Sequence, residues 1–66
     1  MKVKELISIL NTLSKNKDVY LSSDPEGNSY GTIHDRSIFE DDNFYIIAPF
    51  EEGLDYEDLE ERSNNG

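Results

Sequence analysis

The pattern of apolar positions predicts one amphipathic helix at the start of the chain. Over residues 2–14 the apolar side chains recur at intervals of three and four positions, which places them along one face of a helix. They are Val3, Leu6, Ile7, Ile9, Leu10 and Leu13. The helix is expected to end near residues 14–16, because polar residues favour turns there, and Lys15 and Lys17 suit the negative end of the helix dipole.

Beyond residue 18 the pattern changes to that of strands. Residues 19–22 alternate between apolar and polar, and residues 30–33 form the returning strand of a hairpin whose turn contains Pro25 and Gly27. Residues 44–48 are rich in aromatic and β-branched side chains, which makes them the strongest strand signal. The sequence therefore predicts an α+β fold, with one helix packed on a small antiparallel meander of about three strands.

The last part of the chain differs in composition, so we expect a single small domain over residues 1–50 and an acidic segment over residues 51–66. This segment is expected to be partly helical or disordered. Leu54 to Arg62 can form a short helix, with Asp55 as its cap and Asp58 three residues on. Like charges at neighbouring helical positions oppose this helix, so it is expected to form only if Leu54 and Leu59 dock on the rest of the chain.

The charge balance of the chain limits its partners. The 66 residues include 15 acidic and 6 basic side chains, for a net charge of -9. This sign argues against direct binding to nucleic acid or to anionic membranes. No apolar run approaches the length of a membrane span, and the N-terminus lacks a secretory leader, so a cytoplasmic location is expected. Because the chain has no cysteine, disulfide frameworks, thiolate metal sites and cysteine nucleophiles are excluded.

The charge is also segregated along the chain. Residues 1–18 carry four lysines against two acids, a net charge of +2, and residues 19–66 carry two arginines against thirteen acids, a net charge of -11. Two interpretations follow: the acids keep a marginal domain soluble, or they imitate the phosphates of a nucleic acid. In the second case the protein would occupy the nucleic-acid groove of a nuclease, polymerase or repressor.

The mimic hypothesis names two acidic clusters and the apolar side chains between them, because aromatic anchors supply much of the energy of protein interfaces. The candidate partner-binding residues are Glu40, Asp41, Asp42, Phe50, Glu51, Glu52, Leu54, Asp55, Tyr56, Asp58, Leu59 and Glu61. The expected partner is a basic host protein, either a nuclease or another nucleic-acid-binding protein.

A small structural or assembly protein is the alternative. A chain of this length buries little surface, and domains below about 70–80 residues usually need disulfides, metal or oligomerisation. An exposed apolar strand invites pairing with a second copy. In this hypothesis a homodimer closes through Phe44–Ala48, and the acids serve solubility only.

Neither catalysis nor a cofactor is expected. His34 could in principle pair with Ser22, Ser23 or Ser37, but no glycine pattern of a nucleophile elbow surrounds these serines. The chain is also too short to enclose an active site. It is therefore predicted not to be an enzyme.

The turn after residue 23 partly matches a calcium loop. Asp24, Glu26 and Asn28 occupy the first three ligand positions, but the glycine falls at the fourth position instead of the sixth, and Asp35 stands where glutamate is required. A hairpin turn explains the same residues, so no metal site is assigned, and a calcium-responsive hairpin is the third hypothesis.

The first third of the chain carries a family resemblance. Residues 1–7 (MKVKELI), Leu10, Leu13 and residues 18–21 (DVYL) form a lysine-flanked amphipathic helix, a turn and a strand. This opening resembles that of small bacteriophage-encoded accessory proteins, over Met1 to Ser22. The proline usual in their turn is absent here. The resemblance implies a phage setting and a factor that inhibits or redirects host proteins, DNA mimics of host defence nucleases included.

Overall fold

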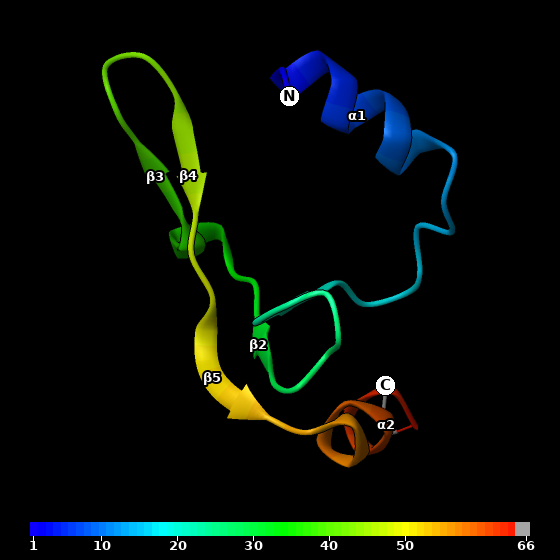
Figure 1. Ribbon diagram of the computed structural model, residues 1–66. Helices are drawn as coiled ribbons and strands as arrows, with labels where there is room; N and C mark the ends of the chain where they lie inside the picture. The colour runs from blue at the N-terminus through cyan, green and yellow to red at the C-terminus, as the bar shows by residue number, and fades with distance from the viewer. Residues whose placement is uncertain (65–66) are drawn as a thin grey trace.

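The computed structural model describes residues 1–64 and confirms the predicted α+β class (Figure 1). In chain order the elements are α1 (Val3–Asn11), β1 (Tyr20–Ser22), β2 (Tyr30–Thr32), the 3₁₀ turn η1 (Asp35–Ser37), β3 (Ile38–Glu40), β4 (Tyr45–Ile47), β5 (Phe50–Leu54) and α2 (Tyr56–Asn64). The expected division between residues 50 and 51 falls inside β5. Residues 65–66 of the expected acidic segment lie outside the described residues.

Helix α1 is shorter than the apolar pattern predicted because its end is closed early by polar groups. At its start the Lys2 backbone N–H donates to Glu5 Oε1 at 3.2 Å. At its end the Thr12 hydroxyl donates to the Ile9 carbonyl at 2.7 Å, and Lys15 Nζ donates to the Asn11 carbonyl at 3.0 Å. Lys15 therefore caps the helix as its charge predicted, although the last helical residue is Asn11.

The strands form two separate antiparallel sheets. A three-stranded sheet has the order β1-β2-β5, and a two-stranded sheet pairs β3 with β4. The β1–β2 hairpin lies where it was predicted, with Tyr20 opposite Thr32. The third strand of its sheet is β5, whereas the strong strand signal over residues 44–48 became β4. Its partner β3 lies outside the strands predicted from the sequence.

Few residues are buried in this fold, and the buried side chains are polar. Among the described residues, no apolar side chain is buried. The buried positions are Gly31, Thr32 and Ser37, which gather around β2 and the start of β3. Ser37 is fully buried: its hydroxyl accepts the His34 backbone N–H at 3.0 Å, and its carbonyl accepts the Ala48 N–H at 2.9 Å. The buried groups are therefore held by local hydrogen bonds and not by a buried apolar core.

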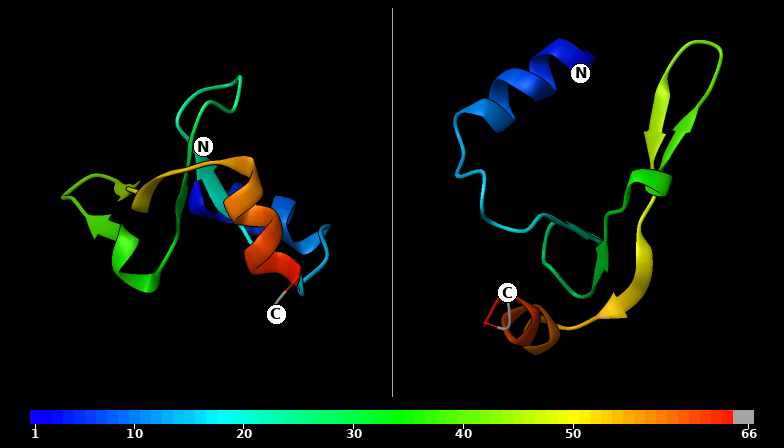
Figure 2. Two further views of the ribbon diagram at one scale, coloured as in Figure 1. Left: turned by 90° about the horizontal axis from the view of Figure 1, so that it is seen from below. Right: turned by 180° about the vertical axis from the view of Figure 1, so that it is seen from behind.

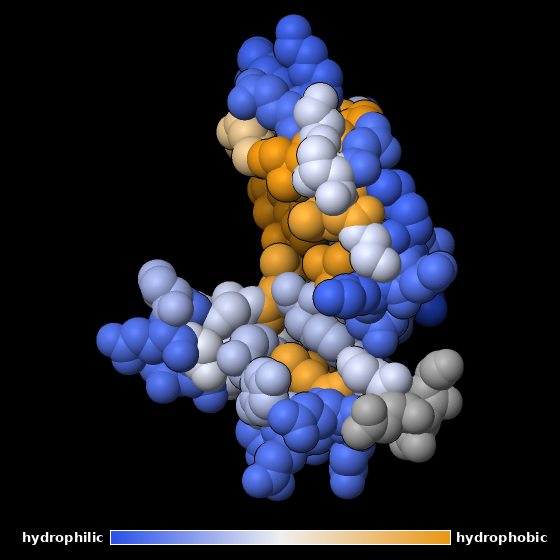
Figure 3. All heavy atoms as spheres, turned by 90° about the vertical axis from the view of Figure 1, so that its right-hand side faces the viewer, coloured by the Kyte–Doolittle hydropathy of each residue, from blue (hydrophilic) through white to orange (hydrophobic). Residues whose placement is uncertain are grey.

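The molecule has two halves of different character. The sheet half consists of β1, β2, β5 and α2, and the apolar half consists of α1, β3 and β4 (Figures 1 and 2). Helix α1 was expected to pack on the three-stranded sheet. Instead it faces the β3–β4 hairpin across an open cleft, and Figure 3 shows apolar atoms lining the hollow. Neither described helix has the length and apolar character that crossing a membrane requires.

Candidate functional site

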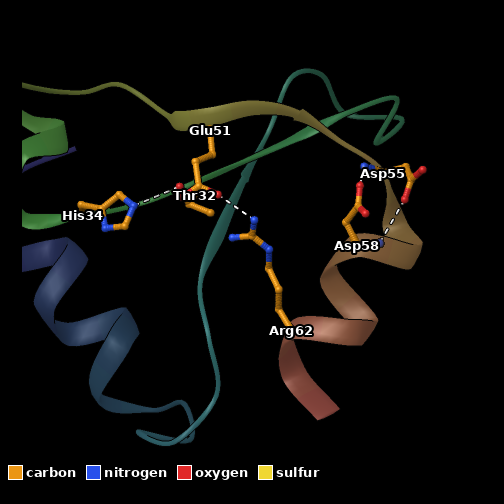
Figure 4. Close-up of polar contacts among 6 residues, drawn as sticks. All are labelled: Thr32, His34, Glu51, Asp55, Asp58 and Arg62. Atoms are coloured by element: carbon orange, nitrogen blue, oxygen red, sulfur yellow. Dashed lines mark hydrogen bonds and ion pairs between the residues drawn. The ribbon is translucent and has the colours of Figure 1, made fainter. Parts of the chain in front are cut away.

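The acidic end of the molecule is built on β5 and α2, and two of its acids form the helix cap. The Asp55 backbone N–H donates to Asp58 Oδ2 at 3.0 Å, and the Asp58 N–H donates to Asp55 Oδ1 at 3.0 Å (Figure 4). This reciprocal arrangement satisfies N–H groups that the first turn of a helix leaves without a partner. The predicted helix and its cap are therefore confirmed, and both carboxylates are engaged in holding α2.

A third acid ties α2 to the sheet. Arg62 Nη2 lies 2.6 Å from Glu51 Oε2, and this is the one ion pair within residues 1–64 (Figure 4). The hydrogen bond to Glu51 raises the pKa of Arg62 above its ordinary value. Glu51 reaches the arginine from a left-handed backbone position, with φ at 41°. Glu51 therefore holds α2 to the sheet, whether or not it also contacts a partner.

The remaining acids of this end project into solvent. Glu52, Glu57, Glu60 and Glu61 are exposed. Glu57 and Glu61 are one helical turn apart and so share a face of α2. Glu57 and Glu60 are missing from the residues predicted from sequence. The helical spacing could have identified them, because a helix capped by Asp55 and Asp58 places its later glutamates outside.

Two of the predicted apolar anchors turn toward the chain itself. Tyr56 and Leu59 line a cleft of about 620 Å³ together with Asn16, Lys17, Asp18 and Tyr20. Leu59 is partly buried there, as Leu54 is at the end of β5, whereas Tyr56 is 63% exposed. Leu59 thus lies partly buried beside the cleft that separates α2 from the linker before β1, and Tyr56 is the anchor most available to a partner.

The second acidic cluster is not brought near the first. Glu40, Asp41 and Asp42 lie at the tip of the β3–β4 hairpin, and α2 lies at the other end of the molecule (Figure 1 and the right view of Figure 2). The Asp41 N–H donates to the Phe44 carbonyl at 2.9 Å and closes the hairpin loop. The predicted clusters are therefore two separate surfaces, at opposite ends of a molecule 36 Å long.

The last predicted anchor, Phe50, packs against the single histidine. Its ring meets the His34 imidazole edge-on, with 5.0 Å between centroids. His34 Nε2 lies 3.2 Å from the Thr32 hydroxyl, while the Ser37 hydroxyl accepts the backbone N–H of His34 and not its ring (Figure 4). The imidazole is thus held by Thr32 and Phe50, and Ser37 has no accessible hydroxyl for nucleophilic attack.

The turn that partly matched a calcium loop is closed by internal hydrogen bonds. Asp24 Oδ2 accepts the Asn28 side-chain amide at 2.6 Å, and Asp24 Oδ1 accepts the Gly27 N–H at 2.8 Å and the Glu26 N–H at 2.9 Å. These bonds, that of the Asn28 side chain above all, lower the pKa of Asp24 below 3.8. Within the part of the chain described, no three His, Cys, Asp or Glu side chains gather as metal ligands.

Comparisons with protein-family models, curated proteins and solved structures found no match to this chain. The resemblance of its first third to phage accessory proteins therefore stays a prediction. What can be said of function rests on charge, exposure and the contacts described above.

Proposed function

We propose that this chain is a non-enzymatic, acidic protein–protein interaction module that binds a basic host protein through β5 and α2. The observation that carries the proposal is the anchoring of α2. Asp55, Asp58 and Glu51 hold the helix by its cap and by the ion pair to Arg62. The other carboxylates are therefore presented on an ordered helix and not on a flexible tail.

Repulsion between the acids of α2 also supports the assignment of partner binding to this helix. Glu57 and Glu61 stand one turn apart, and a like-charge pair at this spacing destabilises a helix by about 0.2–0.5 kcal/mol. Lysine or arginine side chains of a partner would relieve this repulsion. The exposed ring of Tyr56 lies at the start of the same helix, where it can add apolar contact to the charged one.

A nucleic-acid mimic is the concrete form of this proposal. Duplex DNA presents about one charge per 1.7 Å of axis, and a basic groove that binds it would also attract the glutamates of α2. The partner is then a nuclease or another nucleic-acid-binding protein, encountered in the host cytoplasm if a phage encodes the chain. Because Glu40–Asp42 lie at the opposite end of the molecule from α2, we assign partner binding to the β5–α2 end alone.

The test is capture of partners from a nuclease-treated lysate of the natural host, with the tagged full chain as bait and elution by rising salt. We expect a basic nucleic-acid-binding protein that is released as salt increases, since screening weakens exposed charge contacts. Duplex DNA added to the purified complex should displace the bait. Retention that is insensitive to both salt and DNA would contradict the proposal.

A triple variant makes the test specific to α2. Glu57→Gln, Glu60→Gln and Glu61→Gln remove three charges without touching the cap or the ion pair, and they relieve repulsion within the helix. Loss of binding in this variant therefore cannot be ascribed to loss of α2, which circular dichroism verifies. The matched control, Glu26→Gln, Asp35→Asn and Asp42→Asn, removes three exposed acids outside the β5–α2 end and should keep the partner. Equal binding by both variants would reject the assignment.

One observation favours the alternative, a small structural or assembly protein whose acids serve solubility. Three of the predicted binding acids, Glu51, Asp55 and Asp58, are engaged in contacts within the chain. In that case the lysate yields no salt-sensitive partner, and the triple variant differs from the control only in solubility.

A further inference from the structure

The β3–β4 hairpin is apolar on both of its faces. Ile38 stands opposite Ile47, and Phe39 stands opposite Ile46. Because side chains alternate along a strand, the first pair shares one face with Tyr45, and the second pair lies on the other face. Ile38 and Phe39, one from each face, are 51% and 53% exposed. A two-stranded hairpin is only marginally stable in water, so both faces need a cover.

Helix α1 approaches only one of these faces, and it does not close over it. Val3 and Leu6 of α1 line an open cleft of about 890 Å³ with Tyr45 and Ile47 (Figure 3). The helix itself has nine residues, too few to be stable without packing its apolar stripe. Within residues 1–64 nothing covers the face that carries Phe39 and Ile46, both of which stay about half exposed.

The accessible surface of the chain indicates how much cover is missing. The chain exposes 5838 Å². A compact folded protein of this mass exposes about 4,300 Å² by the usual scaling with mass. The difference, about 1,500 Å², falls within the roughly 1,000–2,500 Å² per chain that obligate homodimers bury. The radius of gyration agrees: it is 13.2 Å, against about 10.8 Å for a compact domain of this length.

The charges around the cleft indicate which molecule fits it. Lys2 and Lys4 stand at the start of α1, and Glu40, Asp41 and Asp42 stand at the hairpin tip. Lys2 and these three acids line the same open cleft, so its rim carries both signs of charge. An acidic partner would suit only the helix, and a basic partner only the hairpin. A second copy of this chain offers both charges and both apolar surfaces. In a two-fold symmetric contact each basic helix end can then meet the acidic tip of the other copy.

We infer that the apolar half is covered by the same half of a second copy, so that α1, β3 and β4 of two chains form a single shared core. Two copies supply two helices and two hairpins, enough to cover the hairpin face that α1 leaves open. The β5–α2 ends stay outside this contact and remain free for another partner. Dimer formation is therefore independent of what those ends bind.

The first test is the mass of the full chain by sedimentation equilibrium over a range of concentrations. The expected mass is twice 7.6 kDa. Ile46→Lys places a charge on the uncovered face and should weaken dimerisation about a hundredfold, as loss of a central interface contact does. Val19→Lys is the matched control, because Val19 is an exposed β-branched residue outside the apolar half, and it should remain dimeric. A monomeric wild type at all concentrations, or a dimer equally stable in both variants, would overturn the inference.

A second measurement does not depend on the folding of Ile46→Lys. The chain has no cysteine, so Asn43→Cys gives one site at the hairpin tip for a spin label. When the spin-labelled chain is mixed with isotope-labelled wild type, the spin label should broaden the amide signals of α1 in the wild-type copy. Broadening confined to α2, or absent, would show that another surface or another protein covers the apolar half. The proposed function is judged separately, by salt-sensitive capture.

Discussion

In one half of this molecule polar groups are paired by hydrogen bonds, whereas in the other half apolar side chains stay largely exposed. In the sheet half, β2 pairs on both sides, and the buried Thr32 has a hydrogen-bond partner. In the apolar half, two strands pair only with each other, and the apolar side chains of α1, β3 and β4 are mostly exposed. Local polar contacts can thus close one half within a single chain, whereas the other half leaves its apolar surface exposed.

The difference follows from where the apolar residues lie. The helix of the sheet half is polar, and turns, a cap and one ion pair order this half. The apolar half contains the strongest hydrophobic signals in the chain, yet no other element of residues 1–64 buries its side chains.

The largest effect is expected at Gly31, in the middle of β2. A Cβ atom there would lie 2.5 Å from Pro49 Cβ and 3.1 Å from the Phe50 carbonyl oxygen. Gly31→Ala should therefore lower the free energy of unfolding by about 1–3 kcal/mol, the usual cost of overpacking, as measured by urea denaturation. Gly53→Ala is the comparison: it has open space and a φ of 83°, so only the left-handed backbone cost, about 1 kcal/mol, applies. Equal losses would show that β2 and residues 49–50 are not in close contact.

The cap of α2 should have the next largest effect. Asp55→Ala removes the acceptor for the Asp58 N–H, and loss of such a cap costs about 1 kcal/mol. Helical circular dichroism should fall together with the urea midpoint. Glu57→Ala, which leaves both cap bonds intact, should keep or slightly raise the helical signal. A helix unaffected by Asp55→Ala would contradict the cap assignment.

The pH dependence of the β1–β2 turn tests the local closure of the sheet half. Because the pKa of Asp24 is lowered in the folded state, its ionised form stabilises the fold. That stabilisation is fully present above pH 3.8 and is lost as the pH falls through the lowered folded-state pKa. A carboxyl titration followed by NMR should give a midpoint below 3.8, and Asn28→Ala should raise this midpoint. An unshifted midpoint in the wild type would refute the hydrogen-bonded turn.

The smallest effect is expected for the ion pair between Glu51 and Arg62. Both side chains are close to half exposed, and exposed pairs contribute little to stability because water and salt screen them. Arg62→Gln should therefore lower the free energy of unfolding only slightly, and the difference from wild type should shrink in high salt. A loss that persists undiminished in high salt would mean that Arg62 acts through packing.

Sequence patterns predicted the features that depend on residues close together in the chain. The α1 stripe, the β1–β2 hairpin and the Asp55 cap all follow from spacings of a few positions, and all three are present. The identity of the third strand could not be predicted, because the pairing of β5 with β2 joins segments about twenty residues apart. The same limit applies to the acidic clusters: they are close in sequence, but β4 and β5 lead the chain from the hairpin tip to α2 and place them at opposite ends.

Hydrogen exchange at two protein concentrations tests the contrast between the halves most directly. If a second copy covers the apolar half, protection of the β3 and β4 amides should increase steeply with concentration, and protection of β1, β2 and β5 should increase less. Protection that is the same in both halves and independent of concentration would contradict the account.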